Sequence, residues 1–129
     1  MSTISTHVLD TVLGKPAVGI SVRLEKQRRS GWSAHSESGE TAERVQQAPC
    51  EWIEISAAVT DADGRCRDLA RDAQPGVYRL TFDVGNYFGR NSRTSIYPEI
   101  SITFTCSGEA HYHLPLLLSD NSYTTYRGS

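Results

Sequence analysis

Histidine is the side chain in this sequence best suited to acid–base chemistry near neutral pH. The chain has four: His7, His35, His111 and His113. The unperturbed pKa of histidine is about 6.5, so a neutral ring can take a proton from water and a charged ring can return it. His111 and His113 are two residues apart in a run that we expect to be a strand, where both would point to one face. Together with His7, such a same-face pair would also suit zinc.

Each histidine also has a structural interpretation. A solvated strand face accounts for His111 and His113, and a lone histidine such as His7 in a strand-like run is usually structural. His35 lies in a segment rich in serine, glutamate and glycine and is expected to be solvated. No acidic or thiol ligand lies near the His111–His113 pair in the sequence, so the zinc signal is weak.

Two further segments carry polar groups of interest. Acidic residues and glycine at 61–64 form a turn, after which Arg65 is a solvated cation in the simplest interpretation. The turn has no glutamate at the twelfth position of a calcium loop, which excludes an EF-hand. The segment 123–129 holds two tyrosines, unlike a frayed terminus, so we expect a docked strand that fixes Ser129, with a simple edge strand as the alternative.

Period-two alternation of apolar and polar residues recurs along the chain and predicts half-buried antiparallel strands. The alternating runs are 17–26, 52–59, 77–83 and 99–106, and residues 5–10 form a short strand-like run. The residues expected to face the core are Val18, Ile20, Val22 and Leu24; Ile53, Ile55, Ala57 and Val59; Tyr78, Leu80 and Phe82; and Ile100, Ile102, Phe104 and Cys106. Glycine, proline and aspartate separate the runs, so the pattern predicts an all-β sandwich.

Two segments interrupt this pattern. Residues 83–92 have room for one short helix, although Gly85 and Gly89 disfavour it. Residues 30–50 have only Trp32 and Val45 as large apolar side chains, too few to order the segment. We therefore expect a long mobile loop at about 27–51 within a single domain, 1–129.

The composition excludes several function classes. A chain of 129 residues with 13 basic and 15 acidic side chains has a net charge of −2, so nucleic acid and anionic membranes are poor candidate partners. No apolar run approaches the roughly 20 residues of a membrane span, and the N-terminus does not resemble a secretory signal. Three cysteines without a C-x-x-C pair fit reduced, structural thiols. The expected compartment is the cytoplasm, with the peroxisome left open.

Four separated motifs resemble the transthyretin-like protein family, in the order in which that family has them. They are S-T-H-V-L-D at 5–10 with G-K-P-A at 14–17; T-D-A-D-G-R at 60–65; Y-P-E-I at 97–100 with A-H-Y-H-L-P-L-L-L-S at 110–119; and Y-R-G-S at 126–129. The last is similar to the terminal tetrapeptide that separates the hydrolases of the family from its carrier. The resemblance covers nearly the whole chain outside the expected loop.

This resemblance implies a transthyretin-like (prealbumin-like) Greek-key β-sandwich of seven to eight strands, with the short helix at 83–92. It implies a homotetramer, a dimer of dimers whose sites lie at the subunit interface. The implied activity is hydrolysis of an amide bond of 5-hydroxyisourate in urate and purine degradation, without metal or other cofactor. The alternative is a small-ligand binding module in the manner of transthyretin, without catalysis.

The resemblance also implies the site residues. The catalytic residues would be His7, Arg65, His113 and Ser129, and the substrate-binding residues would be His7, Arg65, Tyr126, Arg127 and Gly128. The histidines would activate water, with the identity of the base left open, and Arg65 would stabilise negative charge on the carbonyl oxygen. The first and the last two strands of this fold share a sheet, so the histidines and the tail are expected to converge.

Overall fold

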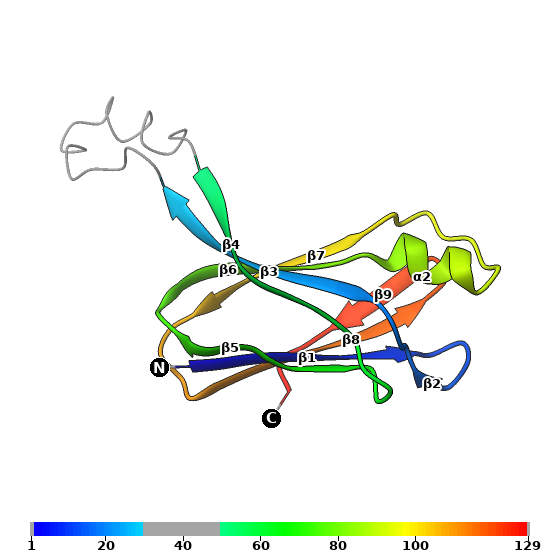
Figure 1. Ribbon diagram of the computed structural model, residues 1–129, viewed down its shortest axis with the longest axis horizontal. Helices are drawn as coiled ribbons and strands as arrows, with labels where there is room; N and C mark the ends of the chain where they lie inside the picture. Colours follow the sequence, from blue (N-terminus) through cyan, green and yellow to red (C-terminus); the bar gives the residue numbers. More distant parts are fainter. Residues whose placement is uncertain (1, 30–49, 129) are drawn as a thin grey trace.

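In the described part of the chain, strands with alternating apolar side chains form two β-sheets that bury these side chains between them, with one short helix at one end of the sandwich (Figure 1). The computed structural model describes residues 2–29 and 50–128. Its elements are β1 Ser2–Asp10, β2 Lys15–Pro16, β3 Ser21–Arg29, β4 Cys50–Val59, β5 Arg65–Ala73, β6 Gly76–Phe82, α2 Val84–Arg90, β7 Ile100–Cys106, β8 His111–Ser119 and β9 Ser122–Thr125. The predicted fold class is confirmed.

The first sheet has the order β2-β1-β8-β9, and β5 also pairs with β1. β1 and β8 run parallel, from the pair Thr3 and His111 to the pair Asp10 and Leu118. The antiparallel arrangement expected for the four alternating runs does not extend to this pair. The alternation of side chains is the same in both arrangements, so the direction of a distant partner is not encoded in it.

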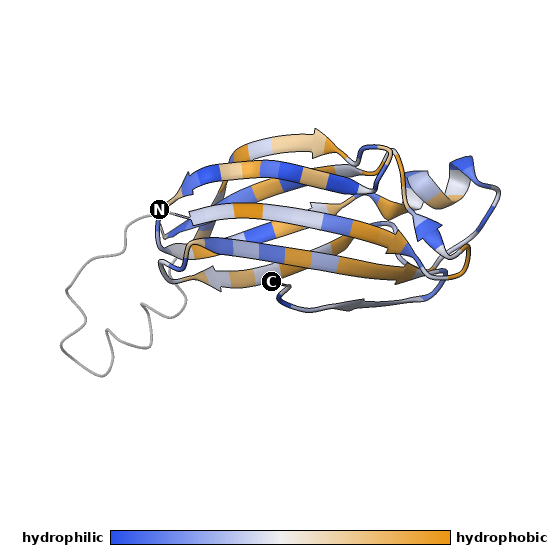
Figure 2. Cartoon of the chain, turned by 90° about the horizontal axis from the view of Figure 1, so that it is seen from below, coloured by the Kyte–Doolittle hydropathy of each residue, from blue (hydrophilic) through white to orange (hydrophobic). Residues whose placement is uncertain are grey.

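The second sheet has the order β4-β3-β6-β7, with all neighbours antiparallel. On β6 and β7 the predicted core positions are confirmed, because Tyr78, Leu80, Phe82, Ile100, Ile102 and Cys106 are buried and Phe104 packs against them. The first sheet contributes Ile4, Val8, Leu116 and Leu118 to the same core. Figure 2 shows the resulting alternation of apolar and polar residues along the strands.

The predicted core positions of β4 are wrong. Ile53, Ile55 and Val59 are 40%, 46% and 58% exposed, respectively. β4 is an edge strand, and its register shifts where β3 passes from Leu24 to Glu25. Ala58, the partner of buried Val22, packs against the core instead. Val18 is also exposed, because β3 begins only at Ser21.

The predicted helix is confirmed as α2, and one of the glycines that disfavoured it has a packing role. A Cβ atom on Gly85 would lie 2.9 Å from the carbonyl oxygen of Pro98. The glycine therefore allows the helix to approach the segment before β7, while Val84, Tyr87 and Phe88 are buried.

The expected mobile loop at 27–51 overlaps a strand at each of its ends. Residues 27–29 belong to β3, and residues 50 and 51 belong to β4. The remainder of that prediction, 30–49, lies outside the described residues.

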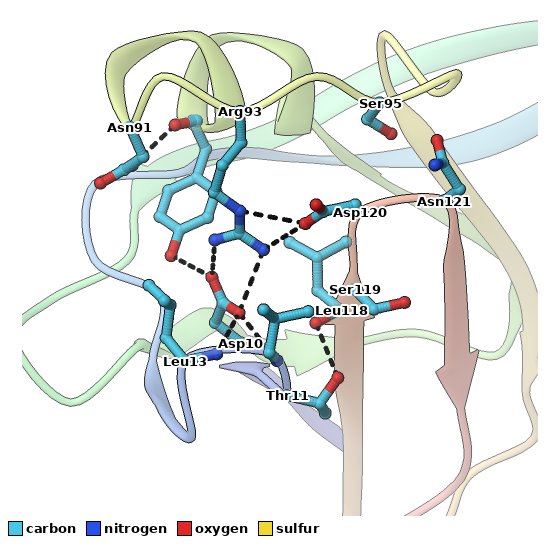
Figure 3. Close-up of polar contacts among 12 residues, drawn as sticks. Asp10, Thr11, Leu13, Asn91, Arg93, Ser95, Leu118, Ser119, Asp120 and Asn121 are labelled. Atoms are coloured by element: carbon cyan, nitrogen blue, oxygen red, sulfur yellow. Dashed lines mark hydrogen bonds and ion pairs between the residues drawn. The ribbon is translucent and has the colours of Figure 1, made fainter.

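A buried carboxylate joins three segments at the end of the sandwich that carries α2 (Figure 3). Asp10, at the end of β1, accepts hydrogen bonds from the Tyr87 hydroxyl (2.7 Å), from the guanidinium of Arg93 and from the backbone N–H of Leu13 (3.1 Å). Arg93 also bonds Asp120 between β8 and β9. Burial raises the pKa of Asp10, but the hydrogen bonds from Arg93 and Tyr87 outweigh burial and lower it overall.

Candidate active site

His7 and Arg65 are direct neighbours on the outer face of the first sheet. They are paired residues of the antiparallel strands β1 and β5. Thr6, Val8 and Cys66, which flank them in sequence, are buried, so His7 and Arg65 point away from the core. An open depression beside them is lined by His7, Leu9, Pro16, Asp63, Arg65 and Arg67.

The turn before β5 fixes the position of Arg65. The carboxylate of Asp61 accepts the backbone N–H groups of Asp63 (2.8 Å) and Arg65 (2.9 Å). The hydrogen bond from Arg65 is the main reason that the pKa of Asp61 is lowered. Gly64 has a φ of +76°, and a Cβ atom on it would lie 2.4 Å from the carbonyl oxygen of Val8. Only glycine lets this turn approach β1, where the Val8 N–H donates to the Gly64 oxygen at 2.7 Å.

His113 lies on the same outer face, on the other side of β1. In the parallel pairing of β1 and β8, His113 is opposite Ser5, and His7 is opposite Pro115. The two histidines are therefore offset by two residues, or about 7 Å along the strands. The predicted orientation of β8 is confirmed, because Tyr112 and Leu114 are buried.

Burial, followed by the nearby positive charges of Arg65 and His7, lowers the pKa of His113 below 6.5. Its ring is therefore mostly neutral at neutral pH. Nδ1 of this ring lies 2.8 Å from the hydroxyl oxygen of Ser5.

The segment after β9 brings Gly128 against His113. The Gly128 N–H donates to the His113 carbonyl oxygen at 2.7 Å, forming an isolated bridge between the two residues. A Cβ atom on Gly128 would lie only 2.8 Å from Cδ2 of His113. A residue with a side chain would therefore displace the imidazole ring.

Tyr126 and Arg127 point to opposite faces of the first sheet. The tail pairs with β8 in one antiparallel register. Thr125 lies opposite Leu116, and three residues further on Gly128 lies opposite His113. Alternation from Gly128 therefore places Tyr126, which is 52% exposed, on the face of His113. The guanidinium of Arg127 instead lies 4.5 Å from the centre of the Tyr112 ring and donates to the His111 oxygen at 3.0 Å. These contacts fix the tail against β8.

The structure thus brings together His7, Arg65, His113 and Gly128, and the expected convergence of the first strand, the last strands and the tail is observed. It does not bring the Arg127 side chain to them. The prediction for Ser129 lies outside the described residues. Sequence reasoning missed Ser5, which lies two residues before His7. Its contact with His113, 108 residues away, follows only from the register of β1 against β8.

The zinc alternative is not supported by the geometry. Among residues 2–29 and 50–128, no three histidine, cysteine, aspartate or glutamate side chains could hold a metal ion together. His111 is opposite Thr3, whereas His7 is opposite Pro115, so the two histidines are separated by about 13 Å along the strands. Burial, with a smaller contribution from Asp61, raises the pKa of the Cys66 thiol to about 11, so this neighbour of Arg65 is not a nucleophile at neutral pH.

Comparison with known proteins identifies the family. Residues 4–128 match the family described as the HIUase/Transthyretin family. The chain belongs to this family. It is 39% identical to the 5-hydroxyisourate hydrolase of Mus musculus over 132 residues, which cover 99% of this chain and 96% of the mouse protein.

Solved structures of the HIUase/Transthyretin family have the same fold. The 5-hydroxyisourate hydrolase of Klebsiella pneumoniae superposes with a TM-score of 0.75 at 34% identity, covering 100% of both chains. Sea bream transthyretin in complex with thyroxine gives a TM-score of 0.76 at 27% identity, covering 98% of this chain and 94% of the other. The backbone fits both, and the sequence is more similar to the hydrolases. In the described part of this family member, no helix is long and apolar enough to cross a membrane.

Proposed function

We propose that this chain hydrolyses 5-hydroxyisourate, opening its ring at an amide bond. The observation that carries the proposal is the meeting of His7, Arg65 and His113 on one face of the first sheet. Amide hydrolysis by water requires a base that is unprotonated near neutral pH and a donor for the developing oxyanion. These three side chains supply both. The choice of 5-hydroxyisourate as the substrate is supported by the similarity to the mouse and Klebsiella hydrolases.

In this proposal His113 is the base that activates water. Its lowered pKa keeps the ring neutral, so it can accept the proton of a water molecule as the oxygen attacks the carbonyl carbon. The C–N bond then breaks, the departing nitrogen takes up the proton that His113 accepted, and the new carboxylic acid releases its own proton to solvent. The proton passes from His113 to the nitrogen directly or by way of His7. His7, offset by two residues on the same face, is placed for this second transfer.

Arg65 is the proposed electrophilic group. Its guanidinium is a planar cation with several N–H donors, which suits a carbonyl oxygen that gains negative charge. Asp61 and Gly64 hold its backbone beside β1. We propose Tyr126 and the backbone of Gly128 as the tail's contribution to substrate binding, with Ser129 as a further catalytic group. Arg127 anchors the tail through Tyr112 and His111.

The test is optical. Urate oxidase generates 5-hydroxyisourate in the cuvette, and its near-ultraviolet absorbance decays spontaneously. The protein should accelerate this decay, and His113→Ala should lower the rate by roughly 10²–10⁴-fold if His113 is the base. A wild-type protein that leaves the spontaneous rate unchanged would defeat the proposal. Saturable binding without acceleration would favour the alternative, a non-catalytic binding module like transthyretin.

We further propose a homotetramer, a dimer of dimers with the sites at the subunit interface. On one chain the depression beside His7 and Arg65 is open, and Tyr126 is 52% exposed on the same face. A second copy against this face would exclude water from the site and strengthen its electrostatic interactions. Light scattering coupled to size-exclusion chromatography should give four times the chain mass; a monomer that retains full activity would contradict this arrangement.

The proposed compartment is the cytoplasm, and the proposed organisation is a single domain. Cys50, Cys66 and Cys106 are all free, as expected of thiols in a reducing environment. One family match extends from residue 4 to residue 128, which supports one domain. Fractionation of cells that contain the protein would test the compartment.

A further inference from the structure

Two hydroxyl–imidazole pairs lie side by side across β1 and β8. Thr3 Oγ1 is 2.7 Å from Nδ1 of His111, and Ser5 Oγ is 2.8 Å from Nδ1 of His113. Each pair joins residues that are direct partners in the parallel register. The pairs are therefore the same contact repeated two residues along the sheet, but only the second belongs to the candidate active site.

The ring of His113 is held at two edges. Ser5 contacts Nδ1 from β1, and Gly128 of the tail lies against Cδ2 on the opposite edge of the ring. In the described part of the chain, the Ser5 hydroxyl is the hydrogen-bond partner of this ring. Since Nδ1 is occupied, Nε2 is the nitrogen left to exchange a proton with water.

The charged and titratable groups around His113 come from three strands. They are His7 on β1, Arg65 on β5 and His111 two residues along β8. Arg65 and His7 act on the charge of the ring through space. Neither sets the orientation of the ring or decides which nitrogen carries the proton of the neutral form. A neutral imidazole without a fixed partner can turn over about its side-chain bond and exchange tautomers.

We propose that Ser5 is a positioning residue for His113. Its hydroxyl holds the ring in one orientation, and in this proposal it accepts the Nδ1–H, which leaves Nε2 unprotonated and able to act as the base. Thr3, which makes the same contact with His111, has no such role. This inference rests on the proposed function, because it assigns His113 the proton transfer.

Three variants test the inference by kinetics. Ser5→Ala should lower kcat on 5-hydroxyisourate roughly tenfold, the effect of losing about one hydrogen bond, with KM little changed. Ser5→Thr keeps the hydroxyl and should restore most of kcat. Thr3→Ala removes the matched hydroxyl beside His111 and should leave kcat unchanged. Thermal unfolding of each variant is the control that the protein remains folded.

Nitrogen-15 NMR of histidine-labelled protein tests the contact without relying on turnover. Above the pKa of His113, its ring nitrogens should report one tautomer in the wild type and a mixture in Ser5→Ala, while Thr3→Ala should change only His111. If the wild type shows no turnover but this pattern holds, the proposed function fails and the positioning contact stands. Unchanged His113 signals in Ser5→Ala, or equal losses of kcat in Ser5→Ala and Thr3→Ala, would overturn the inference.

Discussion

Gly128 is the residue of the tail whose replacement has the most direct consequence. Its φ lies outside the left-handed region, so alanine fits the backbone, but the added Cβ atom would lie 2.8 Å from Cδ2 of His113. Gly128→Ala should therefore lower kcat about tenfold or more by displacing the ring, with little change in the melting temperature. Steady-state kinetics and thermal unfolding measure the two effects.

The control for that variant is Gly89→Ala. Gly89 lies in α2, and a Cβ atom there would meet nothing within 4 Å. This substitution should leave kcat unchanged and stabilise the protein by up to about 1 kcal/mol, the usual difference between glycine and alanine in a helix. Full activity in Gly128→Ala would show that the ring tolerates the displacement.

The charge of Arg65 should be visible in the titration of His113. Because burial, then Arg65 and His7, lower the pKa of His113, activity should persist at pH 6.5 and fall at lower pH, where the neutral form of His113 is lost. Arg65→Gln removes one positive charge, so the pKa of His113 should rise toward 6.5 and the acid limb should move to higher pH. NMR titration of His113 measures this shift even where turnover is low.

Arg65→Lys is the matched variant for this titration. It keeps the positive charge and should leave the pKa of His113 low, while losing the planar arrangement of donors and part of kcat. An identical pKa of His113 in the wild type and in Arg65→Gln would show that the charge of Arg65 does not contribute to the lowered value.

At the scale of elements, the turn between β4 and β5 determines where the arginine lies. Gly64→Ala combines a left-handed backbone (φ +76°) with a contact of 2.4 Å to the Val8 oxygen. We expect it to lose about 2 kcal/mol or more of unfolding free energy, together with activity, because Arg65 moves away from His7. Urea denaturation and the optical assay measure these losses.

Gly14→Ala separates the two causes. Gly14 has a similar φ of +68°, but a Cβ atom on it would meet nothing within 4 Å. It should show the cost of the backbone conformation alone, about 1–2 kcal/mol, with kcat retained. Equal losses of stability and activity in both variants would mean that the approach of the turn to β1 is unimportant.

The sequence predicts best the strands whose pattern is regular. The alternation on β6, on β7 and around His113 identified the buried and exposed faces, because each strand has one face on the core. β5 was missed, since its buried residues Cys66, Leu69 and Ala73 are three and four apart where its pairing with β1 is irregular. β4 was predicted as a strand, but its buried face was predicted wrongly, because an edge strand with a register shift exposes apolar residues that alternation places inside.

The candidate site could be predicted only through the family resemblance. His7, Arg65 and His113 follow no spacing rule, because their proximity depends on strand pairings across much of the chain. The contact of Ser5 with His113 and the outward or inward direction of tail residues depend on register, which periodicity does not fix between distant strands.

For the whole molecule, the Asp10 cluster should be a main source of stability. Asp10→Asn weakens the hydrogen bonds between β1 and Arg93 and removes the negative charge that offsets the burial of the guanidinium. We expect the free energy of unfolding to fall by about 3 kcal/mol. Asp120→Asn should cost less, because the Asp120 side chain is 41% exposed and that of Asp10 is 0%.

Urea denaturation at several pH values checks this prediction. The folded-state pKa of Asp10 lies below its ordinary value of 3.8, so the wild-type advantage should be complete above that pH and should disappear as the pH falls below it. A loss of stability in Asp10→Asn that is no larger than in Asp120→Asn would contradict the assignment.

The parallel pairing of β1 with β8 also has a consequence for biosynthesis. Ser5 and His113 are 108 residues apart, and β1 cannot complete its sheet until β8 has been made. At a translation rate of roughly 5–20 residues per second, the edge of β1 that pairs with β8 remains unpaired for several seconds or more after β1 has been made. Contacts of such long range form slowly, and the face that carries His7, Arg65 and His113 can be completed only after β8 has been synthesised, so we expect an incomplete nascent chain to have no activity.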